Sequence, residues 1–201
     1  MKTLTFKSIE AKEILLNNGV LALPTETVYG LGIRWDSEKA YDDLFSIKKR
    51  KPDKPVAVML SNHFDLDKHF DISSNAKKVI DKFLPGPLTC LVLVKDVPYQ
   101  AHLGTNVAGI RMPGSKELLD FLDLVGVPLQ VTSANLSGEP AIKEFTKVYE
   151  TFKNDGRVQG IIKGECNSGT PTTVVDLTKD KPVVIRVGEI SLKDIEDVFY
   201  R

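Results

Sequence analysis

Polar or cationic side chains follow directly after four apolar, strand-like runs of this sequence. In sheets covered by helices, ligands bind at the ends of strands, so four such ends can converge on one pocket. A guanidinium fork matches the oxygens of a carboxylate or a phosphate, and Arg111 and Arg186 therefore predict an anionic ligand. Either arginine alone would be read as an ordinary surface charge. The four stretches are residues 21–27, 109–113, 130–135 and 184–188.

A dense run of cations, Lys48 to Lys54, closes a stretch with helical spacing. Lys48 and Lys49 fit a helix C-terminus, where cations complement the helix dipole. The cations continue, however, into a segment stiffened by Pro52 and Pro55, and a stiff cationic turn also fits a polyphosphate. Spacing alone leaves both interpretations open.

Several familiar catalytic signatures are missing from the sequence. There is no GxxxxGKS or GxxxxGKT phosphate loop, no GxSxG elbow and no HExxH helix. Gly30-Leu31-Gly32 begins a dinucleotide pattern, but Trp35 stands where the third glycine belongs. We interpret the three histidines as surface residues, because none has a carboxylate or cysteine partner at metal spacing. They are His63, His69 and His102.

The composition is that of a globular chain of 201 residues, with 42% hydrophobic residues, 14 glycines and 11 prolines. Its 27 basic residues balance its 27 acidic residues, which argues against nucleic-acid coating as the main function. No apolar run approaches the ~20 residues of a membrane span, and the N-terminus lacks a secretory signal, so we expect a cytoplasmic protein. Cys90 and Cys166 are too few for a disulfide framework or a zinc site.

Hydrophobic periodicity alternates between helical and strand-like spacing along the chain. Strands and helices mixed in this order predict an α/β fold in which helices cover both faces of a sheet. No repeat, low-complexity tract or linker interrupts residues 1–201, so we expect one domain. Helices are predicted over residues 8–18, 37–49, 74–83, 115–124 and 192–199, and within 143–153. Strands are predicted over residues 20–23, 28–33, 56–60, 88–94, 107–110, 128–132, 158–162, 173–177 and 183–185.

Six short motifs stand in order along the chain. They are PTETVYGLG at residues 24–32, Lys48-x-Arg50, PGPLT at 85–89, RMP at 111–113, TSANLSG at 132–138 and PTTVVD at 171–176. Together they resemble the threonylcarbamoyl-AMP synthase family, also called YrdC-like proteins, over about residues 19–190. The resemblance implies a three-layer YrdC-like fold with a twisted mixed β-sheet, classed as α/β or, in some schemes, α+β. It also implies the short, single-domain type, because longer members add a C-terminal domain.

The activity that the resemblance implies joins L-threonine, bicarbonate or CO2, and ATP into L-threonylcarbamoyladenylate and pyrophosphate. In the family this product feeds the N6-threonylcarbamoyl modification of adenosine 37 in tRNAs. Other proteins of that modification are therefore expected partners, and direct tRNA binding stays open. Threonine's amine adds to CO2 to give a carbamate, which attacks the α-phosphorus, so positioning does most of the work. Mg2+ would arrive with ATP rather than in a protein cage.

The resemblance also implies roles for individual residues. The expected catalytic residues, at the KxR and SxN positions that hold the ATP phosphates, are Lys48, Arg50, Ser133 and Asn135. The further residues expected to bind ATP are Lys54 and Arg186. The residues expected to bind L-threonine are Thr25, Arg111, Ser133 and Thr172, with Arg111 as the partner of the carboxylate.

Four positions depart from the usual pattern of the family. Thr172 stands where many members have serine, which keeps the hydroxyl, and Lys51 stands where a proline usually follows the KxR arginine. Met59 and Val107 stand where some relatives have histidine and threonine, respectively. The family also includes paralogues that lack the KxR and SxN residues, whereas this chain retains both pairs.

Two other functions remain open from the sequence. A domain of this fold can form a carbamoyladenylate from carbamoyl phosphate, as in hydrogenase maturation proteins, but those chains are much larger and carry zinc-finger-like cysteines. A non-catalytic RNA-binding module is the other alternative. The zero net charge and the lack of an aromatic stacking run weigh against RNA binding.

Overall fold

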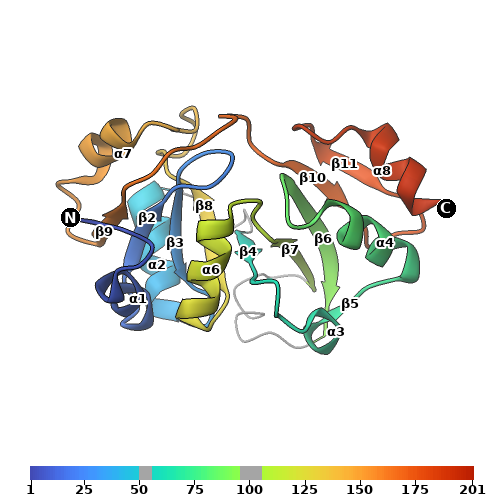
Figure 1. The fold of residues 1–201 in the computed structure, drawn as a ribbon, viewed down its shortest axis with the longest axis horizontal. Helices are drawn as coiled ribbons and strands as arrows, with labels where there is room; N and C mark the ends of the chain where they lie inside the picture. Colours follow the sequence, from blue (N-terminus) through green and yellow to red (C-terminus); the bar gives the residue numbers. More distant parts are fainter. Residues whose placement is uncertain (50–55, 96–105) are drawn as a thin grey trace.

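A mixed β-sheet runs through the whole protein (Figure 1). The computed structural model describes residues 1–49, 56–95 and 106–201. Its strands follow the order β1-β9-β2-β3-β8-β4-β7-β6-β10-β11, and β5 pairs with β6 beside this path. The sheet is mixed because some neighbouring strands are parallel and others antiparallel; for example, β2 pairs antiparallel with β3 and parallel with β9. The strands are β1 (Lys2–Leu4), β2 (Val20–Leu23), β3 (Gly30–Arg34), β4 (Ala57–Met59), β5 (Phe70–Asp71), β6 (Leu88–Val94), β7 (Val107–Arg111), β8 (Leu129–Ser133), β9 (Val158–Ile162), β10 (Thr173–Asp176) and β11 (Val183–Arg186).

Helices cover both faces of the sheet, which confirms the layered α/β fold predicted from the sequence. Alternate residues of β2 point to opposite faces: Val20 and Ala22 pack toward α2 and α7, and Leu21 and Leu23 pack toward α1 and α6. The other half of the sheet packs against α4 and α8. The helices are α1 (Ile9–Leu16), α2 (Glu38–Lys48), α3 (Leu66–His69), α4 (Ser74–Phe83), α6 (Lys116–Val125), α7 (Phe145–Phe152) and α8 (Leu192–Phe199).

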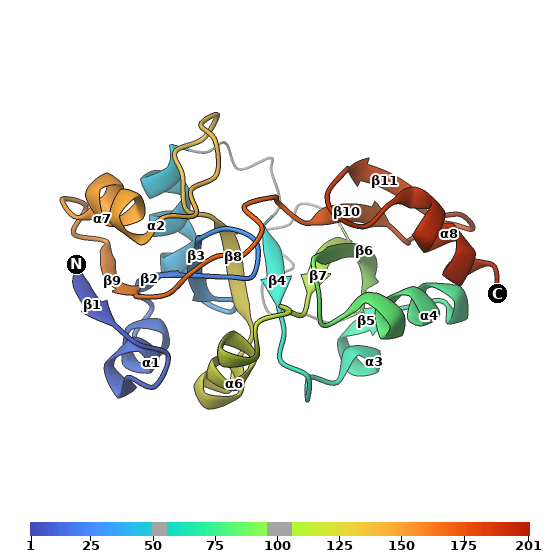
Figure 2. The ribbon, with the colours of Figure 1, turned by 45° about the horizontal axis from the view of Figure 1, so that its top comes forward.

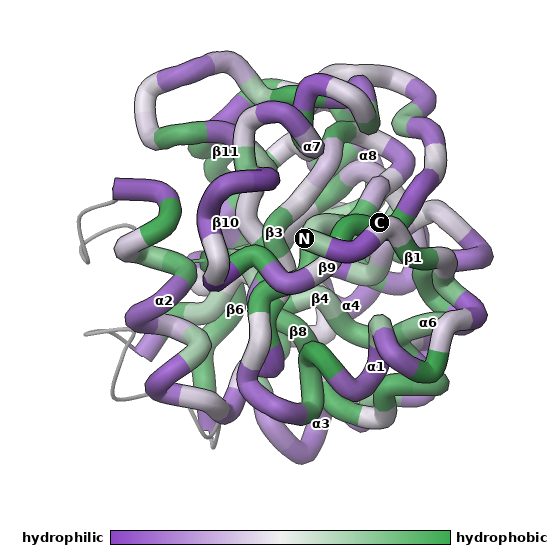
Figure 3. Tube along the Cα trace, turned by 90° about the vertical axis from the view of Figure 1, so that its left-hand side faces the viewer, coloured by the Kyte–Doolittle hydropathy of each residue, from purple (hydrophilic) through white to green (hydrophobic). Residues whose placement is uncertain are grey.

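The hydropathy of the chain follows this layering. In Figure 3 hydrophobic residues gather in the strands at the middle of the molecule, and many outer loops are hydrophilic. Every described strand joins the one sheet, although the single domain expected over residues 1–201 stays a prediction. None of the helices in the described ranges has the length and apolar character needed to cross a bilayer.

Serine side chains cap the N-termini of several helices. Ser37, Ser73, Ser115 and Ser191 each accept a hydrogen bond from a backbone N–H of the first helical turn. Ser8 precedes α1 but makes no such bond. At the other end of α2, Lys49 adopts a left-handed conformation with φ 50°, which ends the helix just after Lys48.

The structure differs from the sequence prediction at three short elements, and several predicted helices and strands begin or end one or two residues away from the observed bounds. β1, α3 and β5 were not predicted, because two to four residues carry too little periodicity to be seen. The strand expected from Val28 begins only at Gly30, because the Thr25 hydroxyl binds both the N–H and the carbonyl of Val28.

The histidines only partly match the surface positions predicted for them. His63 is exposed, with 84% of its side chain accessible. His69 instead packs between aromatic rings, with its centroid 5.0 Å from Phe64 and 5.7 Å from Trp35. His102 lies outside the described residues.

Candidate active site

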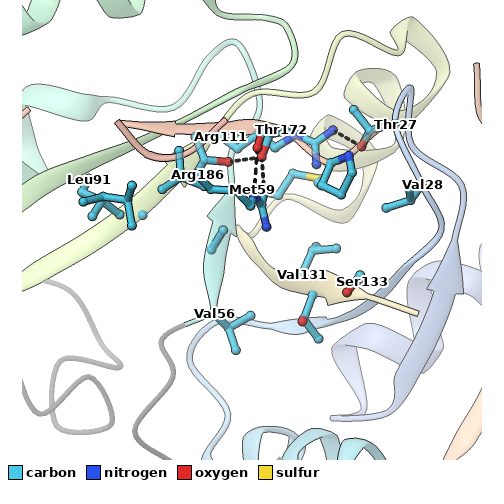
Figure 4. Close-up of a pocket in the computed structure, with 17 residues that line it drawn as sticks. Thr27, Val28, Val56, Met59, Leu91, Arg111, Val131, Ser133, Thr172 and Arg186 are labelled. Atoms are coloured by element: carbon cyan, nitrogen blue, oxygen red, sulfur yellow. Dashed lines mark hydrogen bonds between the residues drawn. The ribbon is translucent and has the colours of Figure 1, made fainter. Parts of the chain in front are cut away.

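A cavity of about 330 Å³ lies on the face of the sheet where its two halves meet (Figure 4). This volume lies in the range of small-molecule sites. Residues from all four stretches singled out in the sequence line it, which confirms that these strand ends converge. The segment that links β9 to β10 crosses the sheet beside it and adds Pro171 and Thr172 to the lining (Figure 2).

The Thr25–Thr27 turn forms one wall of the site and is held by its own hydroxyls. Thr25 Oγ1 lies 2.8 Å from the Val28 carbonyl oxygen, to which it donates, and it accepts from the backbone N–H groups of Thr27 and Val28. Thr25 is 3% exposed and is not among the lining residues, whereas Thr27 lines the cavity. The structure therefore favours Thr27 as the hydroxyl that a ligand meets, and the contact expected from Thr25 stays a prediction.

Arg111, at the end of β7, contacts this turn directly. Its Nη2 lies 2.7 Å from Glu26 Oε1 and donates to Thr27 Oγ1 at 3.2 Å and Thr25 Oγ1 at 3.4 Å. The residue is 9% exposed and lines the cavity, and its Nη1 makes no hydrogen bond to a described residue. Nη1 and the buried Nε are thus the Arg111 donors without a hydrogen-bond partner among the described residues.

Arg186, on the edge strand β11, forms a second guanidinium site at the cavity. Its Nε donates to the Thr172 carbonyl at 3.0 Å, and its Nη2 donates to the Thr172 hydroxyl at 2.9 Å. That hydroxyl also lies 2.8 Å from Thr89 Oγ1. Partial removal from water, followed by the nearby charge of Arg111, lowers the pKa of Arg186 below its ordinary value. The Thr89–Thr172 pair therefore holds the guanidinium in place.

Lys48 and the SxN turn come together as the resemblance implied, but their polar groups largely bind one another. Lys48 is 2% exposed, and its Nζ donates to the carbonyl oxygens of Ser133 and Asn135 and to Asn135 Oδ1. The Asn135 amide donates to the carbonyls of Leu136 at 2.8 Å and Glu139 at 2.7 Å. These contacts shape the turn, so the ATP contacts of Lys48 and Asn135 stay predictions.

Ser133 is placed differently from Asn135, although both belong to the same motif. It lines the cavity, and its hydroxyl makes no hydrogen bond to a described residue. Ser133 is paired with Gly30 across the sheet, where an added Cβ would come within 2.5 Å of Val131 Cγ1. The glycine of the PTETVYG motif thus lets β3 pack closely beside the strand that carries Ser133.

The remaining positions named from the sequence are not all described. Arg50 and Lys54 lie outside the described residues, so their expected ATP contacts stay predictions. Met59 lines the cavity and is 2% exposed. Val107 is not among the lining residues.

Sequence reasoning missed three residues that the fold brings to this site. Glu26 and Thr27 stand beside the predicted Thr25, and Thr89 ends the PGPLT motif. Their membership of motifs was a usable signal. Their contacts with Arg111 and Thr172 could not be predicted from the sequence, because those partners lie far away along the chain.

The thiols and acidic groups of the described residues offer no sign of a metal site. Those residues contain no cluster of three or more His, Cys, Asp or Glu side chains able to hold an ion. Burial raises the pKa of the Cys90 thiol well above its ordinary value, and burial raises that of Cys166 to about 11, so both are protonated at neutral pH.

The fold and the cavity together define an α/β protein whose mixed sheet carries a cavity lined by two arginines. A family model named Sua5_yciO_yrdC and described as "Telomere recombination" matches residues 13–188, so the chain belongs to the Sua5/YciO/YrdC family. This confirms the resemblance inferred from the six motifs.

Individual relatives agree with this assignment. The chain is 37% identical over 183 residues to the threonylcarbamoyl-AMP synthase of Pyrococcus abyssi, covering 89% of this chain and 53% of that protein. The crystal structure of P. abyssi Sua5 complexed with L-threonine matches with a TM-score of 0.87 and 33% identity, covering 94% of this chain and 56% of that one. E. coli YciO matches with a TM-score of 0.84 and 25% identity, covering 92% and 91%. The chain spans about half the length of the P. abyssi protein and of the threonylcarbamoyl-AMP synthase of Bacillus subtilis, and 86% of the putative threonylcarbamoyl-AMP synthase of Methanocaldococcus jannaschii.

Proposed function

We propose that this chain is an L-threonylcarbamoyladenylate synthase, a nucleotidyltransferase that forms the adenylate and pyrophosphate from L-threonine, bicarbonate or CO2, and ATP. The observation that carries the proposal is the cavity itself. Arg111, Arg186 and the unengaged Ser133 hydroxyl, which come from three different strands, meet there in a relative of a protein that binds L-threonine. The product would serve tRNA N6-threonylcarbamoyladenosine synthesis in the cytoplasm, together with the other proteins of that modification.

The amino acid would bind at the wall formed by Arg111 and the threonine turn. Its carboxylate fits the free Nη1 of Arg111, because a guanidinium donates along two edges and Glu26, Thr25 and Thr27 surround only Nη2. The Thr27 hydroxyl and the Thr172 region lie within the same cavity. This arrangement would direct the carbamate nitrogen and oxygens toward the middle of the cavity, where Ser133 lies.

The nucleotide would occupy the side of the cavity that carries Arg186. Charge that grows on the phosphates needs fixed donors, and Arg186 and Ser133 supply them from the described residues. Lys48 would act by holding the turn that carries Ser133 and Asn135. Arg50 and Lys54 would add positive charge near the phosphates. Holding carbamate and α-phosphorus in line supplies up to roughly 7 to 11 kcal/mol of the barrier in favourable cases.

Mg2+ would enter the site on the phosphates of ATP. No aspartate or glutamate is among the described residues that line the cavity, so those residues do not form a Mg2+ ligand set. When bound, the ion would neutralise phosphate charge. We therefore assign no protein ligand to it.

The direct test is a reaction with ATP, bicarbonate and isotopically labelled L-threonine, followed by mass spectrometry of the adenylate. Omission of either threonine or bicarbonate should abolish pyrophosphate release. Serine lacks the methyl group and should react about 10- to 200-fold less well if the cavity encloses that methyl. Pyrophosphate release at the same rate without any amino acid would contradict the proposal and revive the carbamoyl phosphate alternative.

A further inference from the structure

Glu26 contacts Arg111 Nη2, which belongs to a residue that lines the cavity. Its side chain is 14% exposed, and Glu26 is not among the residues that line the cavity. The three heavy atoms nearest to the position that a Cβ would take at Gly114 are the Cγ and Cδ of Glu26 and the Cα of Gly86, at 3.5 to 3.7 Å, so the Glu26 side chain packs beside Gly114. A ligand in the cavity therefore meets Arg111 first and Glu26 only through it.

The contact between the two charges is close but is not a hydrogen bond. Oε1 lies 2.7 Å from Arg111 Nη2, yet neither Glu26 oxygen has a hydrogen-bonding partner among the described residues, and both are buried. Arg111 Nε is also buried without a partner. The ion pair with Arg111 therefore compensates the buried charge of Glu26, and loss of either partner would leave the other charge buried and unpaired.

The net charge around each of the two arginines is therefore different. Arg111 has a carboxylate at contact distance, whereas Arg186 donates its hydrogen bonds within the described residues to neutral oxygens of Thr172. Among the described residues, the Arg111 wall is electrically almost neutral and the Arg186 wall is cationic. A zwitterion carries no net charge, whereas a polyphosphate carries several negative charges, so the two walls favour different ligands.

We infer that Glu26 is a positioning residue that makes the Arg111 wall selective for an amino acid over phosphate anions. This inference rests on the proposed function. Glu26 fixes Nη2 so that Nη1 faces the ligand carboxylate, and its negative charge weakens the attraction of Arg111 for pyrophosphate or the ATP phosphates. The same negative charge favours the ligand's ammonium group before carbamate forms.

The test is the variant Glu26→Gln, which keeps the shape of the side chain and removes its charge. Titration calorimetry on the full chain should show that L-threonine binds about tenfold more weakly, while inorganic pyrophosphate binds as tightly as in the wild type or more tightly. Steady-state assays should show a raised KM for threonine without a raised KM for ATP. Glu165→Gln, an equal charge change at an exposed residue of the neighbouring segment, should leave all of these values unchanged.

If Glu26 had only a structural role, Glu26→Gln would weaken the binding of threonine and of pyrophosphate to the same extent. That result, or wild-type threonine binding in Glu26→Gln, would overturn the inference. Glu26→Asp keeps the charge, so it should keep wild-type pyrophosphate binding, and it serves if Glu26→Gln does not fold. Failure of the proposed function is recognised separately, because the wild-type chain would then form no adenylate.

Discussion

Lys48 Nζ, at the end of α2, donates a hydrogen bond of 2.8 Å to the carbonyl oxygen of Asn135, which lies 87 residues further along the chain. The same ammonium group also binds Asn135 Oδ1 at 3.4 Å and the carbonyl oxygen of Ser133. The backbone N–H of Ser137 returns a bond to the Lys48 carbonyl at 3.1 Å. The end of α2 and the turn after β8 are therefore one hydrogen-bonded unit beside the cavity.

Replacement of Lys48 by methionine should destabilise the protein. The change leaves buried carbonyl oxygens without a donor, and we expect a loss of about 2 to 4 kcal/mol in the free energy of unfolding. Lys49→Met, at an exposed neighbour, should cost less than about 0.5 kcal/mol. Urea denaturation of both variants measures the difference. Equal, small losses would show that the contacts of Lys48 contribute nothing to stability.

Ser133→Ala and Asn135→Ala should damage the protein in different ways. Ser133 makes no hydrogen bond to a described residue, so its loss should lower turnover on the order of 100-fold and leave Tm nearly unchanged. Asn135 binds two carbonyls of its own turn, so its loss should also lower stability by about 1 to 3 kcal/mol. Thermal unfolding beside steady-state rates separates the two effects. An early-melting Ser133→Ala variant with normal turnover would remove Ser133 from the site.

The hydroxyl of Thr172 should matter more than its methyl group. Thr172→Ser keeps the acceptor for Arg186 Nη2 and should keep kcat/KM within about threefold, since no hydrogen bond is lost. Thr172→Val removes that acceptor and the contact with Thr89, and should raise the KM for ATP about tenfold. Steady-state kinetics at varied ATP concentration decide between them. Similar kinetics for both variants would mean that Arg186 is held by the Thr172 carbonyl alone.

Tyr29 should make stability fall at high pH. Burial raises its pKa from 10.0 to about 12, so between these values the unfolded chain loses the phenolic proton while the folded chain keeps it. The contribution of Tyr29 to the free energy of unfolding is therefore fully present below about pH 10, and it is lost as the pH rises toward 12. Denaturation at several pH values should show a smaller decline for Tyr29→Phe than for wild type. The exposed control Tyr200→Phe should follow the wild type, and a Tyr29→Phe variant with the same slope would contradict the assignment.

The sequence was sufficient to predict elements whose ends carry strong local signals. β2 runs from Val20 to Leu23 as predicted, because Gly19 and Pro24 bound its apolar run. α4 likewise has its predicted bounds, with Ser73 at its start and Leu84-Pro85 after its end. β1 could not be predicted, since its three residues become a strand only through pairing with β9.

The candidate site was predictable as a set of motifs but not as a set of contacts. Arg111 and Arg186 were expected at one anionic site, and both line the cavity. Whether Thr25 or Thr27 faces a ligand depends on which of the two hydroxyls is hydrogen-bonded to the backbone of the turn, and in the structure this is Thr25. The pairing of Glu26 with Arg111 depends on the sheet order that brings β7 near the first motif. Such pairings are tertiary and leave no periodic signal in the sequence.

The position of β9 has a consequence for synthesis on the ribosome. β9 lies between β1 and β2, although both of those strands are made long before it. Until residues 158–162 emerge, β1 lacks its only pairing partner among the described strands, and β2 presents an unpaired edge made of residues that are all buried in the finished protein. The nascent chain thus carries an apolar strand edge through most of its elongation, the stage at which chaperones shield such edges from other chains.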